Sequence, residues 1–515
     1  MGKASKKPAA RAGTRRRNKP QDDGAPASAP QADSSVRIRF YCQGIGDCHL
    51  LRFNKDGGHF WMLIDCGVHS SVQDGAETMD AIVDDILLLT KRLDVIVLTH
   101  EHWDHASGFL SAQEKFSGFT VGEIWLAWTE DPTDPQARAL DKFKGDAFTA
   151  LQGASQRLDR SHDDLTRHLA GIQGGLREVL GFVLGAKGEK VRAARNAAIG
   201  LAKGNIKYWE PDDPPFTLAG SVPNIRVYVL GPPRDAAMLR VHTRASEMYE
   251  LAGMSAAPVA LALNEAFRVN DDVAAGWSDA TAPFDPNEGF LLSELFNPST
   301  QTAAAGAGDV TEKAARNVEE LIHERYQNPE QTWRRIDNDW LGVSADLAIQ
   351  LDKLTNNSSL VLAFEFVDTR RVLLFVGDAQ VGNWLSWEAL KWPIDGATVS
   401  AHDLLARTIF YKVGHHGSEN ATLRQKGLEL MVHPDLSAFI PTNKEDAKKV
   451  GWGEMPFESL LKALNTRASN RVIRADDPWV KQENGAPAFG TASGSIKAWR
   501  RDDSPRHLWV ELDIG

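Results

Sequence analysis

The sequence predicts an α/β fold with one core, two helical insertions and a disordered tail. Three observations support this prediction. Strand-like segments occupy both ends of the chain, helical segments interrupt them at about residues 133–205 and 234–350, and no repeat of fixed period is present. We therefore predict a single domain at 36–515 rather than a string of domains.

Residues 1–35 are rich in Ala, Pro, Lys, Arg and Ser and lack apolar periodicity, which predicts disorder. They carry eight Lys and Arg residues against three Asp, whereas the whole chain has a net charge of −11. The body is therefore acidic and poorly suited to wrapping duplex nucleic acid. Arg15–Arg17 is either a nucleic-acid or partner contact or a solvated tail, and we favour the tail. The sequence has no apolar stretch of the kind that a signal peptide or a membrane span needs, so we expect no membrane partner.

The three cysteines, Cys42, Cys48 and Cys66, lie in one segment. An odd number of clustered cysteines does not predict a disulfide framework, so we expect a reducing compartment, namely the cytoplasm. Neither Cys42 nor Cys48 has a partner at zinc-finger spacing, and both are interpreted as small core residues.

The first strand-rich part contains five predicted strands, one of them almost continuously apolar. Alternation and turn residues predict strands at Val36–Phe40, Cys48–Phe53, Phe60–Ile64 and Gly122–Trp128. Helical spacing predicts a helix at Asp80–Arg92. Asp94–Thr99 is almost continuously apolar, as expected for a strand buried on both faces.

The later part returns to strands after each insertion. We predict strands at Val222–Leu230, Ser359–Phe366, Arg371–Val376, Thr408–Val413, Ser437–Pro441, Ser493–Trp499 and Leu508–Asp513, and a helix at Phe457–Thr466.

A dense run of ionisable residues, His100-Glu101-His102-Trp103-Asp104-His105, follows the buried strand at Asp94–Thr99. Zinc and similar cations bind imidazole and carboxylate groups. His100 and His102 are two apart, so an extended or turning backbone can direct both at one ion, and Asp104 and His105 can serve a second. A solvated His-rich loop is the disfavoured alternative, because such residues rarely cluster after a buried strand without a function.

Two further carboxylates stand at the ends of apolar strands. Asp65 can accept hydrogen bonds from the His-rich run and orient it, or it can be a turn residue; the segment alone does not decide. Asp378 follows Val372–Val376 and can bridge two cations, although such an Asp is more often a turn residue.

His415 and His416 stand between Gly414 and Gly417, directly after a predicted strand. Glycines allow close approach of the backbone or unusual φ values. One His can bind a metal while its neighbour contacts substrate. The alternative is a strained turn with surface histidines.

Together these residues occur in the order of the metallo-β-lactamase superfamily, which the chain resembles. It is most similar to the branch that includes the metallohydrolase domain of the DNA-uptake competence protein ComEC. The similarity rests on Gln43–Asp47, on Asn356–Leu362, on Gly377-Asp378 and on the Lys-x-x-His-His-Gly-Ser signature at 412–418. The resemblance covers about residues 36–130, 222–233 and 355–500. It implies an αββα sandwich, the metallo-β-lactamase fold.

The resemblance also implies a metal centre with two divalent ions, zinc or, alternatively, manganese. The first ion would be held by His100, His102 and Asp378, and the second by Asp104, His105, Asp378 and His416. Catalytic roles fall to His415, as a substrate-facing proton donor or contact, and to Asp104 and Asp65. A water between the ions would be acidified to hydroxide at neutral pH. Many members place a further His where this chain has Gly231, which leaves the first site one ligand short.

The function expected from this resemblance is a binuclear phosphodiesterase or nuclease acting on single-stranded nucleic acid, nucleotides or a small phosphodiester. Lys412 and Ser418 are weaker candidates for phosphate contact, and a solvated strand residue is at least as good an interpretation of Lys412. One alternative is a hydrolase of carbon esters, lactones or β-lactams. Another is a binding module with a decayed site, which retention of the other ligands opposes.

Overall fold

The computed structural model describes most of the core but only part of the two insertions. The described ranges are 35–160, 189–248 and 350–515, with short gaps at 56, 219–221, 242–243, 245, 450–454 and 483–484, and five isolated positions between 320 and 328. The tail predicted at 1–35 lies outside them except for its last residue. Most of the insertion predicted at 234–350, and residues 161–188 of the first insertion, also lie outside the described residues.

The first sheet contains eight strands in the order β16-β17-β1-β2-β3-β4-β5-β6. Their bounds are β1 Val36–Tyr41, β2 Cys48–Lys55, β3 Gly58–Cys66, β4 Arg92–Val97, β5 Thr120–Ala127, β6 Ile206–Trp209, β16 Ile496–Arg501 and β17 Trp509–Ile514. The last strand of the chain pairs antiparallel with the first, with Val36 opposite Ile514. The first and last strands of the described chain are therefore neighbours in one sheet.

The second sheet contains seven strands in the order β15-β14-β13-β10-β9-β8-β7. Their bounds are β7 Phe216–Leu218, β8 Val222–Gly231, β9 Val361–Phe366, β10 Val372–Phe375, β13 Thr408–Lys412, β14 Ser437–Ile440 and β15 Val472–Arg474. A separate hairpin pairs β11 (Lys391–Ile394) with β12 (Ala397–Ser400).

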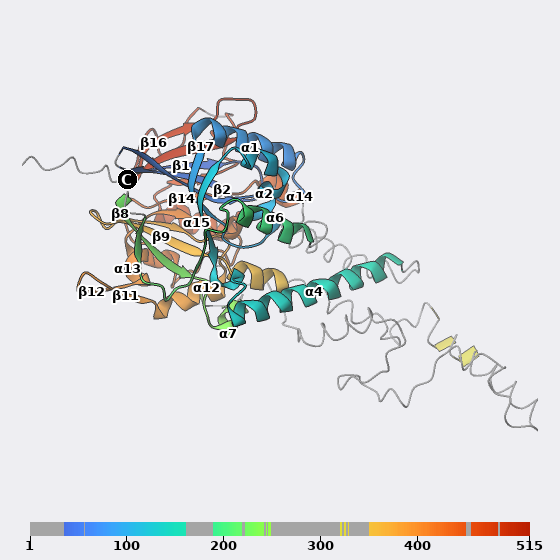
Figure 1. The fold of residues 1–515 in the computed structure, drawn as a ribbon. Coiled ribbons are helices and arrows are strands. Elements are labelled where there is room, and N and C mark those ends of the chain that lie inside the picture. The colour runs from blue at the N-terminus through green and yellow to red at the C-terminus, as the bar shows by residue number, and fades with distance from the viewer. Residues whose placement is uncertain are drawn as a thin grey trace, which may run out of the picture.

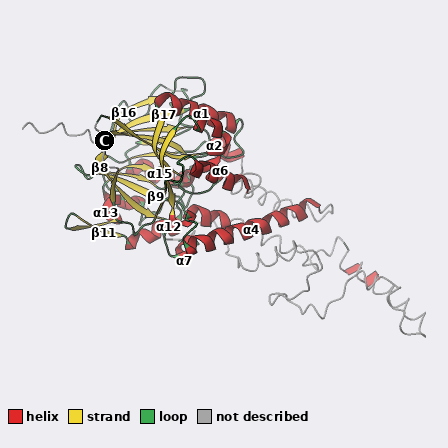
Figure 2. Cartoon of the chain, viewed as in Figure 1, coloured by secondary structure: helices red, strands yellow, loops and turns green. Residues whose placement is uncertain are grey.

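The two sheets pack face to face, and helices cover their outer faces (Figures 1 and 2). Phe40 of the first sheet stacks on Phe439 of the second, with ring centroids 4.1 Å apart. Along β3 the side chains alternate: Met62 and Ile64 face the inner core, while Leu63 faces the helical layer. This double burial explains the near-continuous apolar strands. The four layers confirm the predicted αββα sandwich.

The helices fall into two groups. Those on the first sheet are α1 (Gly75–Leu89), α2 (Trp103–Ser111), α3 (Gln113–Phe116) and α6 (Glu189–Gly200), and those on the second are α12 (Val381–Ser386), α13 (Ala401–Ala406) and α15 (Glu458–Arg467). The other labelled helices are α4 (Pro135–Arg160), α7 (Ala236–Leu239) and α14 (Lys444–Lys449), and residues 350–357 are also helical. Short 3-10 turns occur at Trp128–Glu130, Trp387–Ala389, His415–Gly417 and Leu428–Leu430. Within the part of the chain that the structure describes, every helix is too short or too polar to span a bilayer.

The first insertion is mostly helical where it is described. Helix α4 runs away from the core (Figure 1), whereas α6 packs on α2 in the outer layer of the first sheet. The insertion predicted at 133–205 therefore supplies part of the layer that covers the core.

Some predicted elements need correction. Helix α1 begins at Gly75 rather than Asp80, and it ends at Leu89 because the strand β4 already begins at Arg92. The sequence prediction omitted β6, β7, β15 and the β11–β12 hairpin. These strands have three or four residues, which is too short for alternation to identify them.

Candidate metal centre

The predicted site residues come from strand ends that meet at one edge of the sandwich. β3 and β4 are parallel neighbours in the first sheet, and β10 and β13 are parallel neighbours in the second. Asp65 lies at the end of β3, Asp378 three residues after β10, and His416 four residues after β13. The carboxyl ends of parallel strands carry side chains to the same edge.

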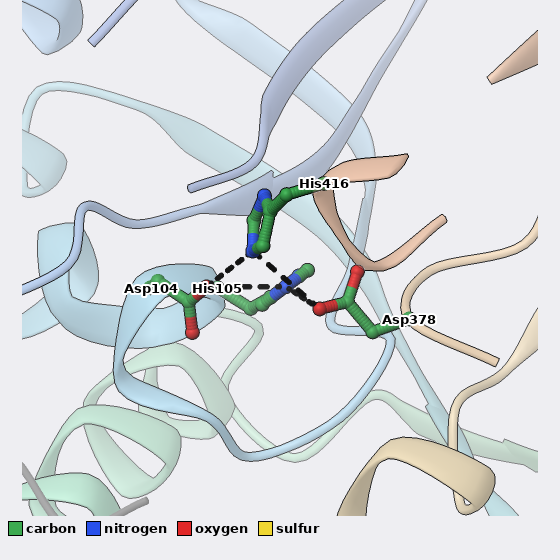
Figure 3. A group of neighbouring side chains, drawn as sticks. All are labelled: Asp104, His105, Asp378 and His416. Atoms are coloured by element: carbon green, nitrogen blue, oxygen red, sulfur yellow. Dashed lines mark hydrogen bonds and ion pairs between the residues drawn. The ribbon is translucent and has the colours of Figure 1, made fainter. Parts of the chain in front are cut away.

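Four of these side chains converge on one point. Asp104, His105, Asp378 and His416 each offer one ligand atom, and these atoms lie within 4.8 Å of one another (Figure 3). His416 Nε2 lies 2.8 Å from Asp104 Oδ2, and His105 Nε2 lies 3.2 Å from Asp378 Oδ2. All four side chains are buried. Residues that are 312 positions apart thus form one compact donor set.

In His105 and His416, the ring nitrogen that faces away from the cluster lies next to a hydrogen-bond acceptor. His105 Nδ1 lies 2.8 Å from Asp65 Oδ2, and His416 Nδ1 lies 3.0 Å from the carbonyl oxygen of Pro441. A ring that donates through Nδ1 presents an unprotonated Nε2 on its other side. This is how metal-binding histidines are usually oriented.

The cluster is rich in negative charge. Burial raises the pKa of Asp104 and Asp378, but the neighbouring His105 and His416 outweigh burial and hold both pKa values well below the usual range. Burial lowers the pKa of His105, yet the surrounding carboxylates raise it well above the ordinary value. Such mutual dependence indicates a site that requires positive charge at its centre.

The donor set fits a divalent cation. His105 Nε2 and Asp104 Oδ1 are buried and form no hydrogen bond within the described structure. Two imidazoles and two carboxylates form the mixed N/O set that zinc binds, and manganese also accepts such ligands. The unsatisfied atoms therefore have a chemical explanation in a bound ion.

His100 and His102 form a second, adjoining pair. His100 Nε2 lies 3.0 Å from His102 Nδ1, and the His100 and His105 rings have centroids 4.2 Å apart. Both residues are buried. The pair thus lies beside the four-residue cluster without belonging to it.

The His-rich run is not a simple loop. Residues 98–102 are irregular, but α2 begins at Trp103, so Asp104 and His105 lie in its first turn. Gly67 allows this helix to approach, because a Cβ there would lie 2.4 Å from the carbonyl carbon of Asp104.

Asp65 lies behind the metal cluster. Its Oδ1 accepts the backbone N–H of Thr99 at 2.8 Å, and its Oδ2 accepts the Thr99 hydroxyl at 2.7 Å. Oδ2 also accepts from His105 Nδ1. Asp65 therefore joins the end of β4 to a ring of the cluster and fixes that ring's orientation.

His415 lies at the edge of the cluster. It is partly exposed, and its backbone N–H donates to Asp378 Oδ1 at 2.8 Å. Its Nδ1 lies 2.5 Å from Ser418 Oγ, which donates to Asn420. Both His415 and His416 have positive φ, of 43° and 52°. Such strained non-glycine conformations persist where surrounding contacts enforce them.

Lys412 is buried, not solvated as the alternative interpretation held. It is 1% exposed at its side chain, forms an ion pair with Asp47 and donates to the carbonyl oxygen of Gly377 at 3.1 Å. Burial lowers the pKa of Lys412, but Asp47 and then Asp378 outweigh it and raise that pKa. Lys412 is therefore an internal counter-ion.

Asn383 occupies the space beside Gly231, the position where many members of the superfamily have a further histidine. A Cβ added to Gly231 would lie 2.1 Å from Asn383 Oδ1. Asn383 is itself fixed, because its Nδ2 donates to the carbonyl oxygens of Asn357 and Ser359 at 3.0 Å. A histidine at position 231 cannot be accommodated without displacing this asparagine.

Sequence reasoning missed three groups near the centre. Glu101 is held by Lys144 and Arg195 of the first insertion. Asp352 and Asn356 lie in helical residues 350–357, beside His102 and His415. Glu101 lies inside the His-rich run, but nothing local in the sequence indicated its partners. Asn356 lies in the segment that carries the family resemblance, without a role assigned to it. Asp352 belongs to no motif.

Residues 43–180 match the family described as the metallo-beta-lactamase superfamily. The chain contains a metallo-beta-lactamase superfamily domain. The matched range includes Asp65 and the run from His100 to His105, and the folded chain adds Asp378 and His416 to it. This superfamily domain supports a metal-dependent hydrolase. No curated protein matches the chain.

Proposed function

We propose that this metal-dependent hydrolase is a binuclear phosphodiesterase or nuclease acting on single-stranded nucleic acid, nucleotides or a small phosphodiester. The observation that carries the proposal is the convergence of Asp104, His105, Asp378 and His416 beside the His100–His102 pair. In this proposal His100, His102 and Asp378 would hold the first ion, and the four-residue cluster would hold the second, so Asp378 would be common to both.

Divalent ions held there, zinc or manganese, supply a water nucleophile at neutral pH and withdraw charge from phosphoryl oxygens. The chain's own residues orient the donors. Asp65 and the Pro441 carbonyl oxygen fix the rings of His105 and His416. The buried Lys412, which pairs with Asp47, has its Nζ 3.8 Å from Asp378 Oδ1. Asp378 Oδ2 faces both rings of the cluster, whereas Oδ1 is occupied by the backbone N–H of His415.

His415 is our candidate for substrate contact. Its partial exposure and the hydrogen bond from its backbone N–H to Asp378 support this choice. Ser418 Oγ accepts from His415 Nδ1, and His415 Nε2 lies 3.3 Å from Asn356 Nδ2. A substrate oxygen would replace Asn356 at Nε2 and would find an N–H there only when the ring is protonated. The role is that of a proton donor or transition-state contact.

The substrate class depends on the competence-protein resemblance and on the closed position at Gly231. Enzymes for β-lactams or lactones would gain from a fully ligated first site, and Asn383 prevents a further histidine there. The acidic body favours a narrow strand or a small phosphodiester over a duplex. A cytoplasmic setting belongs to the same proposal, because Cys42, Cys48 and Cys66 are all buried free thiols.

Turnover of bis-p-nitrophenyl phosphate, nitrocefin and an acyl lactone, each with zinc and with manganese, tests the substrate class. We expect turnover of the phosphodiester alone, and turnover of nitrocefin alone would overturn the proposal. His102→Ala and Asp378→Ala should each remove activity. The two-ion arrangement fails if the wild type holds no more than one ion or if both variants stay active.

A further inference from the structure

The two nitrogens of His102 face different surroundings. Nδ1 lies 3.0 Å from His100 Nε2. Two nitrogen ligands of one zinc ion, each at about 2.1 Å from it, are at most about 4.2 Å apart, so both atoms fit one ion. The ring nitrogens of an imidazole point to opposite sides. His102 Nε2 therefore faces away from the ion that Nδ1 would bind.

On that far side lies the carboxylate of Asp352. His102 Nε2 is buried and has no hydrogen-bond partner in the described structure. Asp352 Oδ1 is 3.7 Å away, and Asp352 Oδ2 accepts from Asn356 Nδ2 at 3.2 Å. The same Asn356 Nδ2 lies 3.3 Å from His415 Nε2. One face of residues 350–357 thus contacts both the metal-side histidine and the candidate substrate histidine.

We propose that Asp352 is a positioning residue for His102 in the first metal site. It accepts the Nε2 proton of His102, which leaves Nδ1 unprotonated toward the ion. Through Asn356 it also ties that ring to His415. This inference rests on the proposed binuclear centre.

The pair needs only a small adjustment to form a hydrogen bond. A normal N–H···O distance is about 2.9 Å, so the gap of 3.7 Å must close by less than about 1 Å. Asp352 is 22% exposed at its side chain, whereas His102 is 3% exposed, so the carboxylate is the less enclosed of the two groups. A carboxylate behind a metal-bound histidine fixes the tautomer and raises the basicity of the ligand.

Orientation of His102 matters in the first metal site because that site has few protein ligands. Asn383 closes the position of a further histidine at Gly231, so the first ion depends on two histidines and the shared Asp378. With few protein ligands, loss of orientation in one ring removes a large share of the binding. We expect a 10- to 100-fold loss of affinity, roughly the range for ligand-orienting partners.

The test is a calorimetric titration of the full-length, metal-free protein with zinc and with manganese. Asp352→Ala should weaken one ion 10- to 100-fold and leave the other unchanged, and Asp352→Asn, which keeps an acceptor oxygen, should recover part of the loss. The matched control is Asp503→Asn, a carboxylate 84% exposed at its side chain. Thermal unfolding of the metal-free variants checks that the fold is retained.

The double variant His102→Ala with Asp352→Ala decides whether Asp352 acts through His102. No loss beyond that of His102→Ala supports positioning. Additive losses would show an independent role, such as direct ligation, and would overturn the inference. In zinc-loaded protein with 15N-labelled histidine, the His102 ring should show a protonated Nε2, and this signature should change in Asp352→Ala.

Two results of the titration separate this inference from the proposed function. If Asp352→Ala binds both ions as the wild type does while His102→Ala loses one, only the inference fails. If His102→Ala binds ions exactly as the wild type does, the first site does not exist. The binuclear proposal and the inference then fail together.

Discussion

Lys144 Nζ lies 2.8 Å from Glu101 Oε1, so helix α4 of the first insertion is joined to the residue between two histidines of the metal centre. Arg195 of α6 lies 3.2 Å from Oε2 of the same carboxylate and 2.5 Å from Glu130. Burial raises the pKa of Glu101, but Lys144 and then Arg195 outweigh it and lower that pKa to about 2. The first insertion therefore helps to hold the His-rich run in place.

Lys144→Met should lower the free energy of unfolding by about 3 kcal/mol. Removing one partner of a buried ion pair costs roughly 3–5 kcal/mol, and Arg195 still faces Glu101, which favours the low end. Urea unfolding followed by circular dichroism measures the change. The double variant Glu101→Gln with Lys144→Met should lose less, because it leaves no unpaired buried charge.

Lys142→Met on the same helix is the matched control. Its side chain is 77% exposed and pairs with Asp146 one turn later, a contact worth less than about 1 kcal/mol. Equal stability losses in Lys142→Met and Lys144→Met would show that Glu101 does not depend on α4.

The longer strands and the clustering of His and Asp residues after them were predictable, whereas the partners of those residues were not. Apolar runs such as Asp94–Thr99 reveal a strand buried on both faces, and dense His and Asp residues after it reveal a site. Glu101 meets Lys144 and Arg195 from 43 and 94 residues away, and no local periodicity carries that information. The burial of Lys412 is equally non-local, because its ion-pair partner Asp47 directly precedes β2 of the other sheet.

Gly231→Ala should destabilise the protein by about 1–3 kcal/mol, the usual cost of overpacking a core. The added Cβ would lie 2.1 Å from Asn383 Oδ1. Asn383 cannot move away cheaply, because it also accepts from Trp387 Nε1 at 3.0 Å. Chemical denaturation measures the loss.

Gly58→Ala provides the comparison for Gly231→Ala. A Cβ at Gly58 has no neighbour within 4 Å, so its free energy of unfolding should change by less than about 0.5 kcal/mol. Adding Asn383→Ala to Gly231→Ala should remove the steric clash. If Gly231→Ala alone is as stable as the wild type, Asn383 does not close this position.

The native protein should react slowly with a thiol reagent at pH 8. Burial raises the pKa of Cys42 to about 11 and that of Cys48 well above its ordinary value, and only the thiolate is reactive. The rate should therefore rise with pH toward 11. Cys66 is also fully buried. All three thiols should titrate rapidly in denaturant, whereas rapid reaction of one native thiol would contradict the buried arrangement.

Chelation should lower the melting temperature, and added zinc or manganese should restore it. Without a cation, the buried carboxylates of Asp104 and Asp378 depend on His105 and His416 for compensation. An ion that binds only the folded chain adds about 2.7 kcal/mol at 100 times its Kd. The variant Asp104→Asn with His416→Ala should lose most of this metal-dependent rise, because it removes half of the four-residue cluster. Differential scanning calorimetry measures both proteins, and an equal rise in the two would place the stabilising ion elsewhere.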